Sequence, residues 1–136
     1  MKIWHGYGSE HSMNLVMIGR FKNVGDAENA KLAIDQLIKQ VSADVDAGEM
    51  VIGQPTDSFT PGMLDLLQAL RVHVLAPDEL QQFGYDANVG LEGDKVVITT
   101  DESDVSAFLK VLVDKGARVE VFSAHFYPEA GHGRGK

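Results

Sequence analysis

The chain has 136 residues, of which 44% are hydrophobic and 24% are charged. This length and balance are those of one globular domain with a hydrophobic core, and they exclude a chain that is disordered throughout. The absence of cysteine excludes disulfide bonds, thiol nucleophiles and thiolate zinc sites, and it agrees with a reducing compartment. We expect a cytoplasmic protein without a membrane partner, because no secretory leader is recognisable and no apolar stretch approaches the roughly 20 residues that span a bilayer.

Acidic residues outnumber basic ones, and the formal net charge is −8. This charge repels a phosphate backbone and disfavours nucleic-acid binding unless basic residues cluster locally. Along the sequence the densest basic group is Arg134 with Lys136, which is too small to bind nucleic acid. We therefore expect no nucleic-acid partner. The acidic surface suits either plain solubility or a basic protein partner.

The domain is predicted to open with a strand and a long helix. Asn14–Phe21 carries apolar side chains on both faces, as a central strand covered on both sides does. Asn23 is a suitable N-cap, and Asp26 places an anion in the first turn of the helix. The helix ends before Gly48. Its apolar residues recur at spacings of three and four: Ala27, Ala30, Ile34, Leu37 and Val41.

Two shorter helices form an insertion over about residues 58–84. Thr60 and Pro61 are a suitable N-cap and first residue for the first of them. Pro77 starts the second, which ends at Gly84.

A hairpin follows the insertion. Val89–Leu91 and Lys95–Thr100 are short apolar runs on either side of Gly93 and Asp94. A glycine in the first position supplies the positive φ of a two-residue type II′ turn, so we expect two antiparallel neighbouring strands.

A helix and a final strand complete the domain. The helix is predicted over Asp101–Gly116, with Asp101 or Ser103 as its N-cap and Gly116 at its end. Val119–Phe126 is the last strand.

This order of elements predicts an α+β fold with a ferredoxin-like split β-α-β sheet, strand order 4-1-3-2 and a two-helix insertion. The single domain covers residues 1–127, and 128–136 is a glycine-rich, flexible tail. Helices cover only one face of such a sheet, yet Val16 and Ile18 make the second face apolar too. Either the inserted helices or another subunit covers that second face.

The topology brings polar side chains to one end of the sheet. The last strand runs antiparallel beside the first, so His125 should lie near Glu10 and His11, with Asp101 at the same edge. His5, His11 and His125 are candidate ligands for a divalent metal, and Glu10, His11 and His125 are candidate catalytic residues of a hydrolase-like enzyme. In a purely structural alternative, these histidines bond to the backbone at exposed strand ends.

The segments Lys2–Ser12, Val97–Asp104 and Gly116–Val121 are similar to those of a family of small uncharacterised bacterial proteins. The resemblance spans most of the chain. It implies no particular activity, cofactor or site residue.

Two functions remain after these exclusions. The first is a non-enzymatic cytoplasmic protein-interaction domain that forms a homodimer, for which the two-sided apolar sheet is the reason. The alternative is a small metal-binding protein or hydrolase-like enzyme that uses the cluster of histidine and glutamate at one end of the sheet.

Overall fold

A computed structural model describes residues 15–54, 56–102 and 105–123. It confirms an α+β fold with one four-stranded antiparallel sheet. In chain order the elements are β1 (Leu15–Arg20), α1 (Val24–Asp46), α2 (Pro61–Leu70), the 3₁₀ helix η2 (Pro77–Gly84), β2 (Ala87–Glu92), β3 (Lys95–Thr100), α3 (Ser106–Asp114) and β4 (Arg118–Ser123).

The sheet is built around β1. The strands lie in the order β2-β3-β1-β4, which is β4-β1-β3-β2 when counted from the opposite edge, and all neighbours are antiparallel. Met17 of β1 pairs with Ile98 of β3 on one side and with Val121 of β4 on the other. The first and last strands are therefore side by side, as the sequence predicts.

Helix α1 begins as its sequence predicts, because Asn23 lies in extended backbone and its Oδ1 accepts a hydrogen bond from Asp26 N at 2.8 Å. The apolar stripe of α1, with Ile34 and Leu37 fully buried, packs on the sheet and on α3.

Helix α2 is joined to α1 through a buried carboxylate. Asp44 of α1 is only 4% exposed, and it accepts hydrogen bonds from Gln40 and from the hydroxyl of Thr60, each at 3.0 Å. Thr60 Oγ1 also accepts from Met63 N at 3.1 Å and so caps α2, as expected. Both carboxylate oxygens of the buried Asp44 thus accept a hydrogen bond, and the bond from Thr60 holds the insertion on α1.

Helix α3 begins later than predicted. Its first residue is Ser106, and Val105 precedes it without a side-chain cap, so Asp101 does not start the helix. The missing cap comes from η2, where Gln82 Oε1 accepts a hydrogen bond from Ala107 N at 2.6 Å. Gly116 ends the helix with a φ of +101°, which confirms the predicted end.

The hairpin between β2 and β3 turns as predicted. Gly93 has a φ of +63°, and the two strands end and begin at the residues that flank Gly93 and Asp94. A glycine at this position of a two-residue turn fixes the register of the hairpin.

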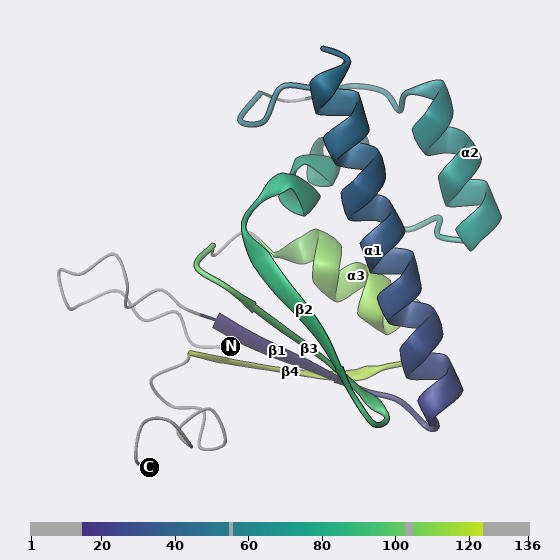
Figure 1. The fold of residues 1–136 in the computed structure, drawn as a ribbon, viewed down its shortest axis with the longest axis vertical. Coiled ribbons are helices and arrows are strands. Elements are labelled where there is room, and N and C mark those ends of the chain that lie inside the picture. The colour runs from purple at the N-terminus through teal and green to yellow at the C-terminus, as the bar shows by residue number, and fades with distance from the viewer. Residues whose placement is uncertain (1–14, 55, 103–104, 124–136) are drawn as a thin grey trace, which may run out of the picture.

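All helices described lie on one side of the sheet (Figure 1). Helix α2 packs on α1, and η2 packs on α1 and α3, where Phe83 meets Phe108 in an edge-to-face contact with ring centres 5.0 Å apart. The insertion therefore thickens the helical layer. Of the two predicted covers for the second face, the inserted helices are excluded.

Candidate functional site

The side of the sheet on which none of the described helices lies is the candidate site, and we call it the open face. Successive side chains of a strand point to opposite faces, and Met17, Ile98 and Val121 belong to the core beneath the helices. The alternate residues form the open face: Asn88, Gly90 and Glu92 of β2; Lys95, Val97 and Thr99 of β3; Val16, Ile18 and Arg20 of β1; and Arg118, Glu120 and Phe122 of β4.

The middle of the open face is apolar. Val16 is 2% exposed and Ile18 is 1% exposed, although neither belongs to the core cluster under the helices. Val97 and Phe122 flank them on the neighbouring strands and are half-buried. These side chains are more apolar than a solvated sheet face needs to be.

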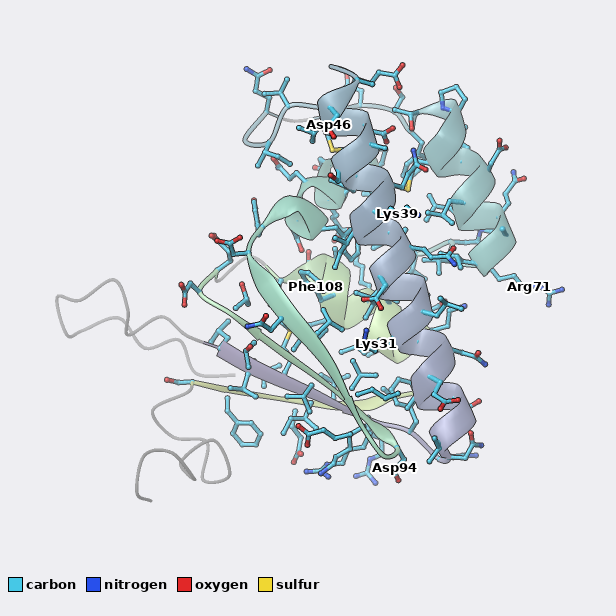
Figure 2. All side chains as sticks on the ribbon, in the orientation of Figure 1. Lys31, Lys39, Asp46, Arg71, Asp94 and Phe108 are labelled. Atoms are coloured by element: carbon cyan, nitrogen blue, oxygen red, sulfur yellow. The ribbon has the colours of Figure 1, made fainter. Side chains whose placement is uncertain are left out.

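A row of three cations crosses the open face at its hairpin end. Arg20 of β1 lies in register between Lys95 of β3 and Arg118 of β4, at the end of the sheet where Asp94 forms the hairpin tip (Figure 2). We call these three residues the basic row. Arg20 Nε contacts Glu120 Oε1 at 3.1 Å, whereas Lys95 and Arg118 have no ion-pair partner among the described residues.

The basic row corrects the expectation that basic residues do not cluster. Arg20, Lys95 and Arg118 are far apart in the sequence, and only the pairing of three strands brings them together. The available signal was their position, since Arg20 and Lys95 lie at the ends of predicted strands, Arg118 immediately precedes one, and these ends meet at the same end of the sheet. Two carboxylates accompany the three cations, because Glu92 pairs with Lys95 across the hairpin and Glu120 contacts Arg20.

The residues of the predicted metal or catalytic cluster, His5, Glu10, His11 and His125, lie outside the described residues. The premise behind the cluster is confirmed, because Leu15 at the start of β1 pairs with Thr100 at the end of β3. Leu15 also pairs with the last residue of β4. In the part of the chain that the structure describes, no group of three or more histidine, aspartate or glutamate residues is placed to hold a metal ion.

A second polar cluster joins η2 to α3. Glu79 accepts hydrogen bonds from Ala76 N at 2.9 Å, from the hydroxyl of Ser106 at 2.8 Å and from Lys110 Nζ at 2.8 Å. Burial alone would raise the pKa of Glu79, but these hydrogen bonds and the charge of Lys110 outweigh it and hold the pKa below its usual value.

Ser106 in this cluster is bonded on both sides, because it donates to Glu79 and accepts from Gln82 Nε2 at 3.0 Å. A serine nucleophile needs a base that can take its proton, and a carboxylate with a lowered pKa is a poor one. The cluster therefore joins two helices, and we call the hydrogen bonds of Glu79 and Gln82 to Ser106 and Lys110 the clamp.

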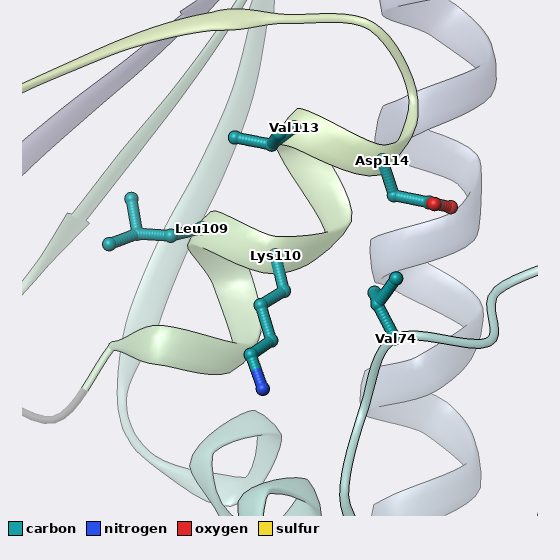
Figure 3. Close-up of a pocket in the computed structure, with 5 residues that line it drawn as sticks. All are labelled: Val74, Leu109, Lys110, Val113 and Asp114. Atoms are coloured by element: carbon teal, nitrogen blue, oxygen red, sulfur yellow. The ribbon is translucent and has the colours of Figure 1, made fainter.

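A shallow apolar groove of about 380 Å³ runs beside α3. Leu109, Lys110, Val113 and Asp114 of α3 line it together with Val74 from the segment before η2 (Figure 3). Val113 is 59% exposed, and Lys110 is already engaged by Glu79. The groove lacks convergent polar groups that would orient a small molecule.

No helix among the described residues is long and apolar enough to cross a membrane. Comparison with curated proteins gave no match, and comparison with solved structures gave none either. A family model does match residues 1–134, almost the whole chain, in agreement with the resemblance to an uncharacterised family. The chain belongs to this family, the family of unknown function DUF6375.

Proposed function

We propose that this chain is a non-enzymatic, cytoplasmic protein-interaction domain that forms a homodimer through its open face. The observation that carries the proposal is the pair of half-buried apolar side chains Val97 and Phe122, which flank the buried Val16 and Ile18 on the side of the sheet where no described helix lies. The cytoplasmic location rests on the cysteine-free composition. For the fold, the proposal adopts the ferredoxin-like class, which the element order and the two antiparallel neighbours of β1 support.

The size of the open face sets the expected affinity. Four strands about 4.8 Å apart and six residues at about 3.4 Å each give a projected area of roughly 400 Å² per subunit. This is small beside the roughly 800 Å² per partner of a standard interface. Val16 and Ile18 have almost no exposed surface left, so Val97 and Phe122 would supply most of the new apolar contact. We therefore expect a weak dimer that forms at high micromolar concentration.

Size-exclusion chromatography with light scattering tests the dimer. We expect the untagged chain at high micromolar concentration to have twice its 14.8 kDa mass. Val97→Lys places a charge on the open face and should return the mass to that of the monomer with an unchanged circular dichroism spectrum. Val113→Lys makes the same change on the exposed side of α3 and should leave the dimer intact. A wild-type chain that stays at 14.8 kDa contradicts the proposal.

A basic protein is the second kind of partner that the net charge of −8 suits. The basic row makes the open face a poor place for it, so such a partner would bind an acidic surface elsewhere. Co-purification from a native lysate at low salt tests this variant, and a chain recovered without any basic partner counts against it.

The alternative function is metal binding or hydrolysis by Glu10, His11 and His125. The pairing of Leu15 with Thr100 and Ser123 supports it, because it brings three strand ends together at the end of the sheet where the candidates are expected. Metal analysis of protein purified without a histidine tag is the test. Stoichiometric zinc or another divalent ion that is lost in His11→Ala and in His125→Ala supports this function, and a metal-free protein after incubation with zinc opposes it.

A further inference from the structure

Two side chains at the centre of the open face are buried although none of the described helices lies over them. Val16 is 2% exposed and Ile18 is 1% exposed. Val16 lies in register between Thr99 and Phe122. Side chains stand roughly perpendicular to a sheet, so those of neighbouring strands shield the flanks of a residue more than its tip. The burial of Val16 and Ile18 therefore indicates a further layer over the middle of the open face.

Two stretches of the chain outside the described residues adjoin the sheet. Residues 1–14 lead into Leu15, the first residue of the central strand β1, and residues 124–136 follow Ser123, the last residue of the edge strand β4. Leu15 pairs with Ser123, so both stretches join the sheet at the same end. Each therefore starts where a turn back over the open face would begin.

The composition of the first stretch suits a layer on an apolar surface. Ile3, Trp4 and Tyr7 are large apolar or aromatic residues, and Lys2 is the only charged residue among residues 1–7. Residues 8–12, Gly-Ser-Glu-His-Ser, are polar and contain residue types that favour turns. The sequence thus places an apolar segment, then a reversal, then β1. We call residues 1–7 the N-terminal segment.

The second stretch suits the role less well. Its two aromatic residues, Phe126 and Tyr127, come almost directly after β4 and leave few residues for a reversal. The residues beyond them are rich in glycine and contain no large apolar side chain. Composition therefore favours the N-terminal segment as the cover.

The lengths of the elements agree with this choice. Strand β1 has six residues and is about 20 Å long at about 3.4 Å per residue. The N-terminal segment spans about 24 Å when extended, enough to run the length of β1. Residues 8–12 reach up to about 17 Å, which exceeds the roughly 10 Å that separate a sheet from a layer packed on it.

We propose that the N-terminal segment lies on the open face of its own chain, over Val16 and Ile18, with Trp4 and Tyr7 supplying the apolar contact. A second copy of the chain would use the same face, so the segment and the second copy compete for it. The competition rests on the homodimer proposed above, whereas the docking of the segment does not.

Fluorescence quenching by an attached nitroxide tests the docking. Trp4 is the only tryptophan and the chain has no cysteine, so one introduced cysteine carries the label at a chosen position. Thr99→Cys places the label on the open face beside Val16, and Val113→Cys places it on the exposed side of α3. In dilute protein with a monomeric mass, we expect strong quenching of Trp4 from Thr99→Cys and none from Val113→Cys, relative to the diamagnetic form of each label.

Acrylamide quenching of the unlabelled chain gives a measurement that no label can disturb. Acrylamide should quench Trp4 severalfold less in the folded wild type than in the chain unfolded by urea. Val97→Lys places a charge on the open face and should raise the quenching towards the unfolded value, because a charge disfavours an apolar cover. Val113→Lys is the control and should leave the quenching as it is in the wild type.

Three outcomes would overturn the docking. In the first, Trp4 is as accessible to acrylamide in the folded chain as in the unfolded one. In the second, only the label on α3 quenches Trp4, which would place the segment in the groove lined by Val74 and Val113. In the third, quenching from Thr99→Cys is lost on mixing with excess unlabelled Trp4→Phe chain, which would place the segment on a second copy.

The dimer affinity of Trp4→Lys tests the competition separately. The apparent affinity scales with the fraction of chains whose open face is free, so this variant should dimerise about tenfold more tightly than the wild type. Light scattering over a range of concentrations measures the change. A dimer of unchanged affinity overturns the competition. A monomeric mass in both chains at high micromolar concentration overturns the homodimer and the competition, whereas the docking is then decided by the fluorescence of Trp4 alone.

Discussion

The two faces of this sheet are built from the same four strands and differ in what covers them. On the covered face, Met17 and Ile98 enter one core with α1 and α3, and their burial follows from folding alone. On the open face, Val16 and Ile18 are as deeply buried, yet no described helix lies on their side (Figure 1).

The difference shows where a function should be sought. Apolar residues of the covered face are explained once the helices are in place. On the open face, Val16 and Ile18 are buried within the single chain as well, whereas Val97 and Phe122 keep exposed area and lie near the basic row. Apolar side chains that folding leaves partly exposed, such as Val97 and Phe122, are the better candidates for an interface.

Truncating one phenylalanine on each face gives the largest expected contrast. Phe108 is 1% exposed and packs edge-to-face on Phe83, so Phe108→Ala should lower the free energy of unfolding by about 3–5 kcal/mol. Phe122 is half-buried on the open face, and Phe122→Ala should cost about 1–2 kcal/mol. Urea unfolding of dilute protein measures both. Equal losses of unfolding free energy in the two variants would mean that Phe122 is part of the hydrophobic core of the single chain, as Phe108 is.

The same contrast can be drawn with two glycines. A Cβ on Gly19 would lie 3.1 Å from a methyl group of Leu112 and 3.2 Å from the Cβ of Ala117, so Gly19→Ala should cost about 1–3 kcal/mol. A Cβ on Gly90, on the open face, meets only the carbonyl oxygen of Val97 at 3.8 Å. Gly90→Ala should be neutral or stabilise by about 0.5–1 kcal/mol. Thermal unfolding of the two variants checks the difference, and a destabilised Gly90→Ala would show that the open face is already packed.

Local signals in the sequence predicted local structure well. Asn23 caps α1 and Gly93 turns the hairpin, because both effects involve residues three or fewer positions apart. The start of α3 was not predictable in this way, since its cap is Gln82, which another element supplies.

The candidate site depends even more on long-range pairing. The strand pattern showed that the second face of the sheet is apolar, and it left open what covers that face. The basic row appears only when the register of β1, β3 and β4 is known, because a shift of one residue would turn Lys95 to the other face. The predicted cluster of Glu10, His11 and His125 stays a prediction.

The clamp between η2 and α3 should make the stability of the helical layer depend on pH. Glu79 has a folded pKa below its usual value of 4.5, so its contribution is present above the unfolded pKa and disappears as the pH falls through the folded pKa. Glu79→Gln should therefore cost about 1–2 kcal/mol at neutral pH and progressively less in acid.

Urea unfolding from neutral pH into acid measures this dependence. The control is Asp78→Asn, the neighbouring exposed carboxyl, which should leave the pH profile unchanged. A Glu79→Gln penalty that stays constant into acid would contradict the role of the ionised carboxylate in the clamp. Because Glu79 lies in the helical layer, the dimer should keep its affinity in both variants.

The smallest expected effect concerns the ion pairs of the two regions. Arg20 and Glu120 on the open face have side chains 46% and 52% exposed, so a double-mutant cycle on dilute protein should give a coupling of about 0.5 kcal/mol or less. The pair of Lys110 with Glu79 includes a carboxylate only 13% exposed, and its coupling should be larger. At high protein concentration a second copy would exclude water from Arg20 and Glu120, and their coupling should rise while that of Lys110 and Glu79 stays the same. A coupling on the open face that does not change with concentration would place this ion pair outside any interface.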